Sequence, residues 1–265
     1  MFKRILKAVF FVAILSYVPL RTLAWGQQGH RIVGEIADNY LTAKARAAIQ
    51  KILGNESMAM ASTWADFIKS DTSYRYLNAW HYADFPKGLS YSAVENVLKN
   101  DTTTDAYTRL NFLVSELKKK NLPQDKKLMY LRLVIHIVGD IHQPLHVSPD
   151  GDAGGNDIKV SWFGQPSNLH RVWDEQLIDD QKLSYTDYTK WINHTTTTQR
   201  KKWQSQSISD WMAESYELSV QLHDAIKDTN QKLSYVYIFK NIGTVNEQLL
   251  KGGVRLAGLL NQIFG

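Results

Sequence analysis

The chain has 265 residues, of which 31 are basic, 26 are acidic and none is cysteine, and its formal net charge is +5. The absence of cysteine excludes a disulfide framework and thiolate metal ligands. With 44% hydrophobic residues, the chain is long enough to bury one large core, and no second domain is required.

The first residues are typical of a secretory signal peptide. The basic start MFKRILK precedes an apolar run from Ala8 to Leu20 and a small residue, Ala24. Because this run is shorter than the ~20 residues that span a bilayer, cleavage after Ala24 and export to the periplasm or medium are favoured over a membrane anchor. Removal of residues 1–24 leaves 27 of the 31 basic residues against all 26 acidic ones. Any affinity for phosphate must therefore come from a local site.

Helical periodicity dominates the first half of the remaining chain. Apolar positions three and four apart predict an amphipathic helix, or a pair of helices, from Gly29 to Leu53, with Gly54 as a stop. Residues 100–105 are polar and are expected to form a solvated loop. The segment from Asp125 to His142 is apolar on nearly all sides, which predicts a central buried helix.

The second half is expected to contain a small β excursion between helices. Alternating apolar residues predict a strand from Asp157 to Phe163, followed by a turn-rich segment over residues 164–168, and together they favour a β-hairpin or a loop. Residues 195–202 are polar and are expected to form a second solvated loop. Two further helices are expected, over Ser209–Ile226 and over Tyr235–Phe264, the latter interrupted at Gly252-Gly253. The sequence therefore predicts a mainly α protein with one domain over residues 25–265.

Two histidine–aspartate pairs recur at helical spacing. His136 and Asp140 lie four residues apart in the predicted buried helix, which places them on one face, and His170 and Asp174 repeat the spacing after the strand. His146 lies just beyond the buried helix, and a second triad fits there. Buried imidazole and carboxylate groups must be partnered, so each pair is either a hydrogen-bonded or ion pair, or a set of metal ligands. The repetition in a cysteine-free chain favours metal.

The remaining histidines and acidic residues are ordinary when taken singly. Asp66 and His81 each follow a tryptophan by one or two positions. Imidazole with carboxylate suits zinc best, although manganese and iron accept the same ligands. His142 is expected to have a structural role, and His194 and His223 lie in polar surroundings and are expected at the surface.

Taken together, the motifs resemble those of a known family. They are Trp25-Gly26 with His30, Trp64-Ala65-Asp66, Asn78-Ala79-Trp80-His81-Tyr82, His136-Ile137-Val138-Gly139-Asp140-Ile141-His142-Gln143-Pro144-Leu145-His146, Gly154-Gly155-Asn156 and His170-Arg171-Val172-Trp173-Asp174. In this order they resemble the S1/P1 type zinc nucleases, which include fungal and plant single-strand nucleases and are related in fold to bacterial zinc phospholipase C. The resemblance implies a multi-helix fold of the zinc phospholipase C/nuclease type with a small β-hairpin.

The resemblance also implies a site with three zinc ions. Asp66, His81, His136 and Asp140 would hold one ion; His146, His170 and Asp174 a second; and the amine and carbonyl of Trp25, with His30 and the shared Asp140, the third. An α-amine with a pKa near ~8 can lose its proton to a metal ion, whereas an amide nitrogen would not coordinate. Because Trp25 has a free amine only after cleavage, removal of the signal peptide is expected to be part of the mechanism.

The implied activity is hydrolysis of single-stranded DNA and RNA to 5′-phosphorylated products, together with 3′-nucleotidase activity, by attack of a zinc-bound hydroxide. Clustered zinc ions lower the pKa of a bound water from ~15.7 toward ~7. Asp66 is expected to orient the attacking water as well as to bind metal. Lys69 stands where fungal relatives often have arginine, and it lacks the bidentate fork. It is either a transition-state stabiliser or a solvated surface lysine.

A base-binding site is expected beside His81. The resemblance implies Tyr82, Asp84, Lys87 and Asn156 as the residues that bind substrate. An aromatic face stacks on a base with ~1–3 kcal/mol, although Tyr82 could instead pack in the core. A recessed metal cluster reached through stacking favours single strands over a stiff duplex. The expected partner is a single-stranded nucleic acid or nucleotide, and the expected state is a monomer.

Two other functions are compatible with the same residues. A zinc phospholipase C would share the fold, but that branch usually has glutamate at the position of Asp174. A non-catalytic, zinc-stabilised binding protein is the second alternative. Structural zinc sites are closed by four protein ligands, whereas the predicted second site has three and leaves a position for water or substrate.

Overall fold

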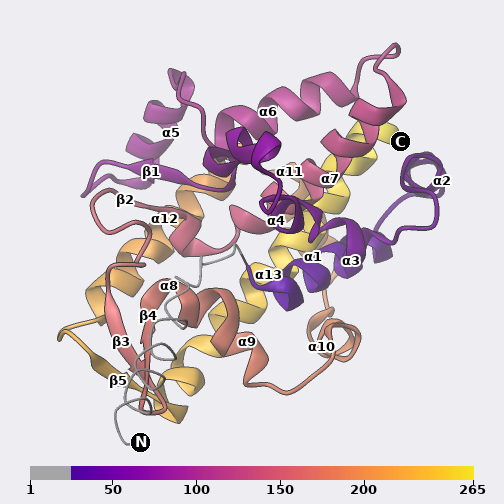
Figure 1. The fold of residues 1–265 in the computed structure, drawn as a ribbon. Coiled ribbons are helices and arrows are strands. Elements are labelled where there is room, and N and C mark those ends of the chain that lie inside the picture. Colours follow the sequence, from indigo (N-terminus) through magenta and orange to yellow (C-terminus); the bar gives the residue numbers. More distant parts are fainter. Residues whose placement is uncertain (1–24) are drawn as a thin grey trace, which may run out of the picture.

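The structure is a computed structural model that describes residues 25–265, so the predicted signal peptide lies outside the described residues. It is mainly helical, as predicted (Figure 1). The elements are α1 (Gln27–Asn39), α2 (Ala43–Leu53), α3 (Met58–Ala61), α4 (Trp64–Ile68), the 3₁₀ helix η1 (Thr72–His81), β1 (Ala83–Phe85), α5 (Tyr91–Lys99), α6 (Ala106–Leu117), α7 (Gln124–Asp140), η2 (Pro144–His146), β2 (Val147–Pro149), β3 (Lys159–Trp162), β4 (Gln165–Asn168), α8 (Leu169–Arg171), the π-helical turn η3 (Val172–Gln176), α9 (Leu177–Asp179), α10 (Tyr185–Ile192), α11 (Thr197–Ser205), α12 (Ile208–Ala225), β5 (Gln231–Leu233) and α13 (Tyr235–Phe264). None of the helices within residues 25–265 has the length and apolarity to cross a membrane.

The buried helix α7 lies at the centre of the fold (Figure 1). Every residue from Leu133 to Asp140 is buried, as its nearly continuous apolar sequence predicts. The buried apolar side chains of the described residues form one continuous core. His136 and Asp140 are therefore held in the interior, and the packing around α7 fixes their position.

The first predicted helical region is a pair of helices, α1 and α2, which are separated at Tyr40–Thr42. Gly54 ends α2 with a φ of 65°, a left-handed conformation that glycine adopts without strain. The longest helix, α13, packs along α1 (Figure 1).

The prediction that Gly252-Gly253 interrupts the last helix is wrong, since α13 is continuous. A Cβ atom at Gly253 would lie 2.4 Å from the Cβ of Ile36, so glycine is needed here for the close approach of the two helices. Each glycine in a helix costs about 1 kcal/mol relative to alanine, and packing against α1 offsets that cost.

The predicted β-hairpin is present. Strands β3 and β4 pair antiparallel, with Trp162 opposite Gln165, and β5 adds a parallel partner to β3. Phe163 and Gly164 form the two-residue turn, and both have positive φ, as a type I′ turn requires. The turn-rich segment therefore contains the return strand β4.

One of the two predictions of a solvated loop is wrong. Residues 100–105 are irregular, but α11 covers most of residues 195–202. Thr196 and Gln199 form a capping box, in which each side chain accepts a hydrogen bond from the backbone N–H of the other. The helix buries none of its residues, so it has no apolar stripe that periodicity could reveal.

A short parallel pair of strands brings two predicted ligand segments together. Ala83 of β1 lies opposite Val147 of β2. Because His81 precedes β1 and His146 precedes β2 directly, this pairing places the two histidines side by side although they lie 65 positions apart in the sequence.

Candidate metal centre

Asp140 lies at the centre of a buried group of histidines and carboxylates. Its Oδ2 is 3.2 Å from Nε2 of His136 and 3.0 Å from Nδ1 of His81. Its Oδ1 is 3.3 Å from Nε2 of His30, which α1 provides. Asp66, from α4, lies with Oδ1 3.7 Å from Nε2 of His136. The two oxygens of Asp140 therefore face different histidines, as a carboxylate shared by two metal ions would.

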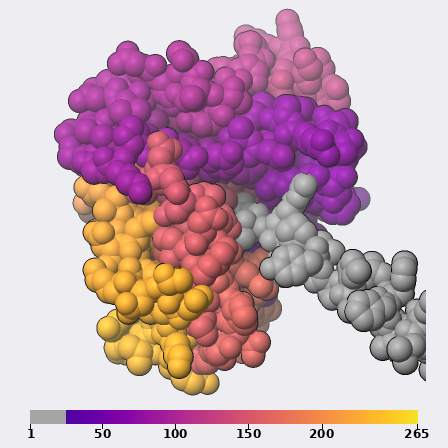
Figure 2. Space-filling model, turned by 60° about the vertical axis from the view of Figure 1, so that its left-hand side comes forward, coloured from indigo at the N-terminus to yellow at the C-terminus, as the bar shows by residue number. Residues whose placement is uncertain are grey.

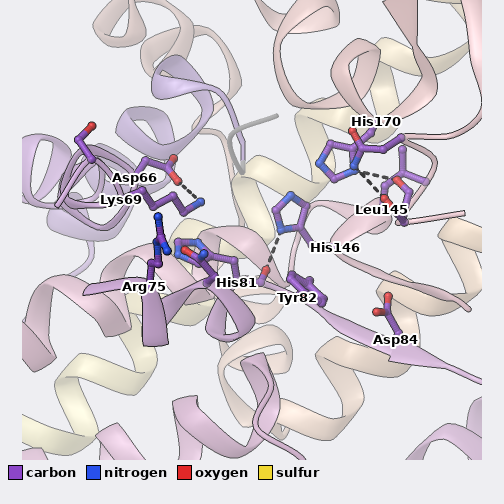
Figure 3. Close-up of a pocket in the computed structure, with 14 residues that line it drawn as sticks. Asp66, Lys69, Arg75, His81, Tyr82, Asp84, Leu145, His146 and His170 are labelled. Carbon is purple, nitrogen blue, oxygen red and sulfur yellow. Dashed lines mark hydrogen bonds and ion pairs between the residues drawn. The ribbon is translucent and has the colours of Figure 1, made fainter. Parts of the chain in front are cut away.

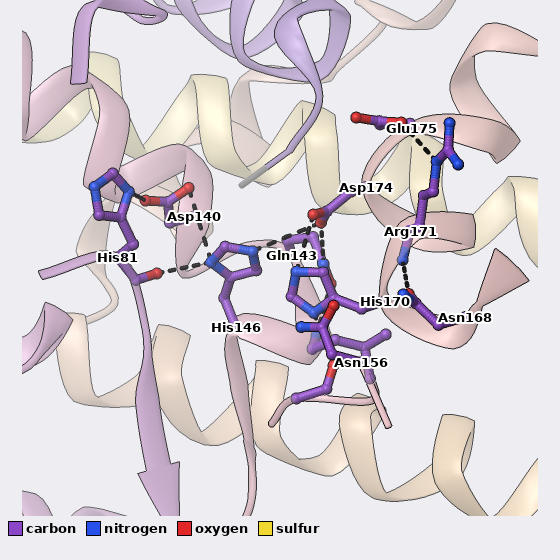
Figure 4. A network of polar contacts seen from close by, with 12 residues as sticks. His81, Asp140, Gln143, His146, Asn156, Asn168, His170, Arg171, Asp174 and Glu175 are labelled. Carbon is purple, nitrogen blue, oxygen red and sulfur yellow. Dashed lines mark hydrogen bonds and ion pairs between the residues drawn. The ribbon is translucent and has the colours of Figure 1, made fainter. Parts of the chain in front are cut away.

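A second group lies beside the first (Figure 4). Oδ2 of Asp174 is 2.9 Å from Nε2 of His170, and its Oδ1 is 3.6 Å from Nε2 of His146. The Gln143 side chain donates a hydrogen bond to Oδ1 of Asp174. Nδ1 of His146 lies 3.9 Å from Oδ1 of Asp140, which connects the two groups. Asp174 is part of the π-helical turn η3, a feature that often occurs at functional sites.

Backbone carbonyls fix the direction of three of these rings. In each, Nδ1–H donates to a carbonyl oxygen and Nε2 points toward a carboxylate, which is how second partners orient metal-binding histidines. The pairs are His136 with Ser62 at 2.6 Å, His146 with His81 at 2.7 Å and His170 with Gly154 at 2.7 Å.

Several polar atoms of these groups are buried without a hydrogen-bond partner among residues 25–265. They are Nδ1 and Nε2 of His30, Nε2 of His81, Oδ1 of Asp140, Nε2 of His146 and Oδ2 of Asp174. An unpartnered buried polar atom costs ~1–3 kcal/mol, so this many in one place require another partner. Ligand atoms lie within 4.8 Å of one another in three groups: His30, Asp66 and His136; His81, His136 and Asp140; and His146, His170 and Asp174. The residues fit metal ions, and imidazole with carboxylate suits zinc.

The charges of the cluster influence one another strongly. Burial alone would raise the pKa of Asp66, but His136 and Lys69 lower it to about 2. Burial and the positive charge of Lys69 lower the pKa of His81 to about 4. Burial opposes protonation of His146, but the nearby carboxylates of Asp174 and Asp140 raise its pKa to about 9. The carboxylates are therefore ionised at neutral pH, as metal ligands must be.

Trp25 lies against the second group. Its side chain is fully buried, and the backbone N–H of Gly26 donates to the carbonyl oxygen of Asp174 at 2.7 Å. His30 follows Trp25 after about one turn of α1. The backbone of Trp25 is thus placed next to the histidine and aspartate groups, whereas its indole packs in the core.

A cavity of about 710 Å³ opens onto both groups (Figure 3). Four of the predicted ligands line it: Asp66, His81, His146 and His170. Lys69 and Arg75 lie on one side, and Tyr82 and Asp84 on the other (Figure 3). The lining also includes Ser70, Asn78, Ala153, Gly154 and Asn156. The histidine–carboxylate groups are therefore accessible from outside through a recess with one cationic and one aromatic side.

Most of the predicted substrate residues line this cavity. Tyr82 is 44% exposed, so its ring does not pack in the core. Lys69 is fixed by an ion pair with Asp66, at 2.7 Å between Nζ and Oδ1, and is not a freely solvated surface lysine. Lys87 is exposed and does not line the cavity.

The sequence interpretation missed Arg75 and Asn78 as cavity residues. Both lie in η1, together with His81, at intervals of three residues. Side chains three apart are eclipsed on a 3₁₀ helix, so these two share the face of His81, and all three line the cavity. Had the segment been recognised as a 3₁₀ helix, the spacing would have indicated them.

The other histidines lie away from these groups. His142 is buried and donates from Nδ1 to the carbonyl of Val138, while its Nε2 lies 3.0 Å from the guanidinium of Arg255. His194 is exposed, as predicted. The prediction for His223 is wrong in part, since it is mostly shielded and its Nε2 lies 2.8 Å from Oδ2 of Asp152.

Comparison with known proteins agrees with this geometry. A family profile described as S1/P1 Nuclease matches residues 25–265. The chain is 31% identical over 278 residues to Endonuclease 3 of Arabidopsis thaliana, covering 96% of this chain and 93% of the relative. It is 29% identical over 283 residues to Nuclease S1 of Aspergillus oryzae, covering 91% and 92%. It is 27% identical over 271 residues to Nuclease P1 of Penicillium citrinum, covering 91% and 98%.

Proposed function

Because this chain belongs to the S1/P1 nuclease family, we propose that it is a zinc-dependent endonuclease that cleaves single-stranded DNA and RNA to 5′-phosphorylated products and also removes phosphate from 3′-nucleotides. The observation that carries this proposal is a pair of linked histidine–carboxylate groups at the base of a cavity with a cationic side and an aromatic side. The activity is hydrolysis of phosphoester bonds.

Three zinc ions are assigned to these residues. Asp66, His81, His136 and Asp140 hold one; His146, His170 and Asp174 a second; and the amine and carbonyl of Trp25, with His30 and Asp140, the third. The two differently directed oxygens of Asp140 support its role as a shared ligand. When bound, zinc ions lower the pKa of water and neutralise the charge of a phosphodiester.

The cationic side of the cavity binds the phosphate groups. Asp66 accepts a hydrogen bond from the attacking water and orients it toward phosphorus. Lys69, held 2.7 Å from Asp66, donates to a non-bridging phosphate oxygen as negative charge develops there. Arg75 makes no ion pair with any residue of 25–265, so its guanidinium is free to bind the phosphate next to the scissile one.

The aromatic side of the cavity binds the base. Tyr82 presents its exposed ring for stacking, and Asp84 and Asn156 offer hydrogen-bonding groups to the edge of the base. A base must be unpaired and turned outward to enter a recess of this kind, which a stiff duplex resists. This requirement favours single-stranded substrates.

We further propose that the chain is exported and cleaved after Ala24, and that it acts as a monomer without a stable protein partner. The chemistry of the third metal position supports the cleavage site, because only a free amine on Trp25 can bind zinc there.

The proposed function is tested with the purified chain that begins at Trp25. Single-stranded DNA, the same sequence as a duplex, 3′-AMP and phosphatidylcholine vesicles are incubated with it, and the DNA product ends are determined by mass spectrometry. We expect rapid cleavage of the single strand with 5′-phosphate ends, slower cleavage of the duplex and release of phosphate from 3′-AMP. Hydrolysis of phosphatidylcholine alone would identify a phospholipase C, and no hydrolysis at all would favour a zinc-stabilised binding protein.

A further inference from the structure

The loop between β2 and β3 has an unusual backbone. Gly151, Ala153, Gly154 and Gly155 all have positive φ, and Ala153 has a φ of 53° although it carries a Cβ atom. Residues other than glycine adopt this conformation rarely and at a cost in energy. The surrounding contacts must therefore hold the loop in place.

This loop sets the direction of a proposed metal ligand. The carbonyl oxygen of Gly154 accepts the hydrogen bond from Nδ1 of His170 at 2.7 Å, and Nε2 of His170 then faces Oδ2 of Asp174 at 2.9 Å (Figure 4). A Cβ atom at Gly154 would lie 2.4 Å from the carbonyl oxygen of Leu145, so the loop packs tightly on η2. A small displacement of the loop would turn the imidazole of His170.

Asp152 holds the loop from within. Its Oδ1 accepts a hydrogen bond from the backbone N–H of Gly155 at 2.7 Å, and its carbonyl oxygen accepts one from the N–H of Asp157 at 3.1 Å. Oδ2 of Asp152 lies 2.8 Å from Nε2 of His223. The carboxylate therefore connects the loop to a residue outside it.

His223 belongs to the last turn of α12, which lies beside this part of the chain (Figure 2). Its Nδ1–H donates to the carbonyl oxygen of Ser219 at 2.6 Å, which fixes the ring on the helix and directs Nε2 at Asp152. Only 16% of the His223 side chain and 20% of the Asp152 side chain are exposed, so water screens their interaction less than it screens a surface pair.

Other carboxylates lie near Asp152. Burial and the charges of Asp150 and Asp152 raise the pKa of Asp84. His223 is the ion-pair partner of Asp152 within the described residues. Without His223, Asp152 would lose this contact with α12 and keep only its hydrogen bonds within the loop.

We infer that His223 is a positioning residue for the metal centre: through Asp152 it holds the loop whose Gly154 carbonyl orients His170. The inference rests on the proposed function in one respect, namely that His170 binds zinc. His223 does not line the cavity, so its replacement leaves every direct contact with substrate in place. The contact between His223 and Asp152 can therefore be removed without removing a proposed zinc ligand.

Replacements of His223 can separate its hydrogen bond with Ser219 from its close contact with Asp152. In His223→Gln the amide reaches the position of Nε2 and can still donate to Asp152, but the bond to Ser219 is lost. In His223→Asn the amide reaches the position of Nδ1 and can donate to Ser219, but not to Asp152. His223→Leu removes both contacts. His194→Leu, at an exposed histidine away from the metal groups, is the matched control.

The test measures how fast the zinc-loaded proteins lose metal to an excess of chelator. Loss of a partner that orients a metal ligand typically weakens metal binding about 10- to 100-fold. We expect one zinc ion to leave about 10-fold faster from the Asn and Leu variants, and at close to the wild-type rate from the Gln variant and the control. Equal rates in all variants would overturn the inference, as would a Gln variant that loses zinc as fast as the Leu variant.

The outcome is separable from that of the proposed function. If His223→Leu fails to fold, the Gln and Asn variants still give the comparison, with melting temperatures as the check on folding. Zinc release that follows the expected order, in a protein that does not hydrolyse single-stranded DNA, would overturn the proposed function alone. Normal hydrolysis with unchanged zinc release in all variants would overturn the role of His223 alone, and a chain that binds no zinc would overturn both.

Discussion

Replacement of Asp140 by asparagine is the sharpest perturbation of the metal centre. The carboxylate is fully buried, with Oδ2 3.0 to 3.2 Å from His81 and His136 and Oδ1 3.3 Å from His30. Removing one partner of a buried charge pair costs ~3–5 kcal/mol, and each ~1.4 kcal/mol is a tenfold change in a dissociation constant. Asp140→Asn should therefore weaken zinc binding roughly 100- to 4,000-fold at the two positions that share this residue.

The second group should be affected much less, because its carboxylate is Asp174. Titration with a competing chromophoric chelator should then show three tightly bound zinc ions in the wild type and one in Asp140→Asn. Asp125→Asn, on the exposed first turn of the same helix, serves as the control and should keep three. A variant of Asp140 that still binds three zinc ions with wild-type affinity would refute the assignment of this residue as a shared ligand.

Three further outcomes follow from the same geometry. One extra residue before Trp25 should remove about one zinc ion and nearly all hydrolysis; unchanged metal content with full activity would refute the amine ligand. Arg75→Ala should raise KM for a single-stranded oligonucleotide about 10-fold, from the loss of ~1.5 kcal/mol in a charged hydrogen bond, with zinc content unchanged; an unaltered KM would exclude phosphate binding. In the metal-free protein, the pKa of His146 is about 9, above its unfolded value of ~6.5. Its contribution of roughly 3 kcal/mol is fully present below pH ~6.5 and lost as pH rises through 9. Urea unfolding at pH 6 and 9.5 should show this loss, and His146→Gln should reduce it; equal pH dependence in both proteins would contradict the pairing with Asp174.

The helical core was predictable from the sequence because buried helices show a pattern of apolar residues. The nearly continuous apolar face of α7 indicated its central place, and the turn chemistry of Phe163-Gly164 lay within the predicted hairpin. Solvated helices leave no such pattern. The helix α11 buries nothing, and only the capping box at Thr196 and Gln199 could have revealed it.

In α13 the sequence led to the prediction of a break where the helix is continuous. Gly253 has a low helix propensity, but its missing side chain makes room for Ile36 of α1. A sequence contains no direct information on which distant helix will come so close. Tertiary packing therefore decided the conformation against local propensity.

In the candidate site, too, some residues could be predicted from the sequence and others could not. His136 with Asp140, and His170 with Asp174, are neighbours on a helix and could be recognised from spacing. Arg75 depended on the 3₁₀ conformation of η1.

The contact between His223 and Asp152 joins residues that only the tertiary fold brings together. Local periodicity cannot indicate a pair of this kind, because the two residues belong to a loop and a distant helix.

Zinc content tests the central claim most directly. The purified chain whose N-terminus has been sequenced as Trp25 is dialysed against metal-free buffer, and its zinc is counted per chain by mass spectrometry. The account predicts three zinc ions, together with loss of single-strand cleavage when a chelator removes them. A mature chain that cleaves single-stranded DNA at full rate with no bound metal would contradict it.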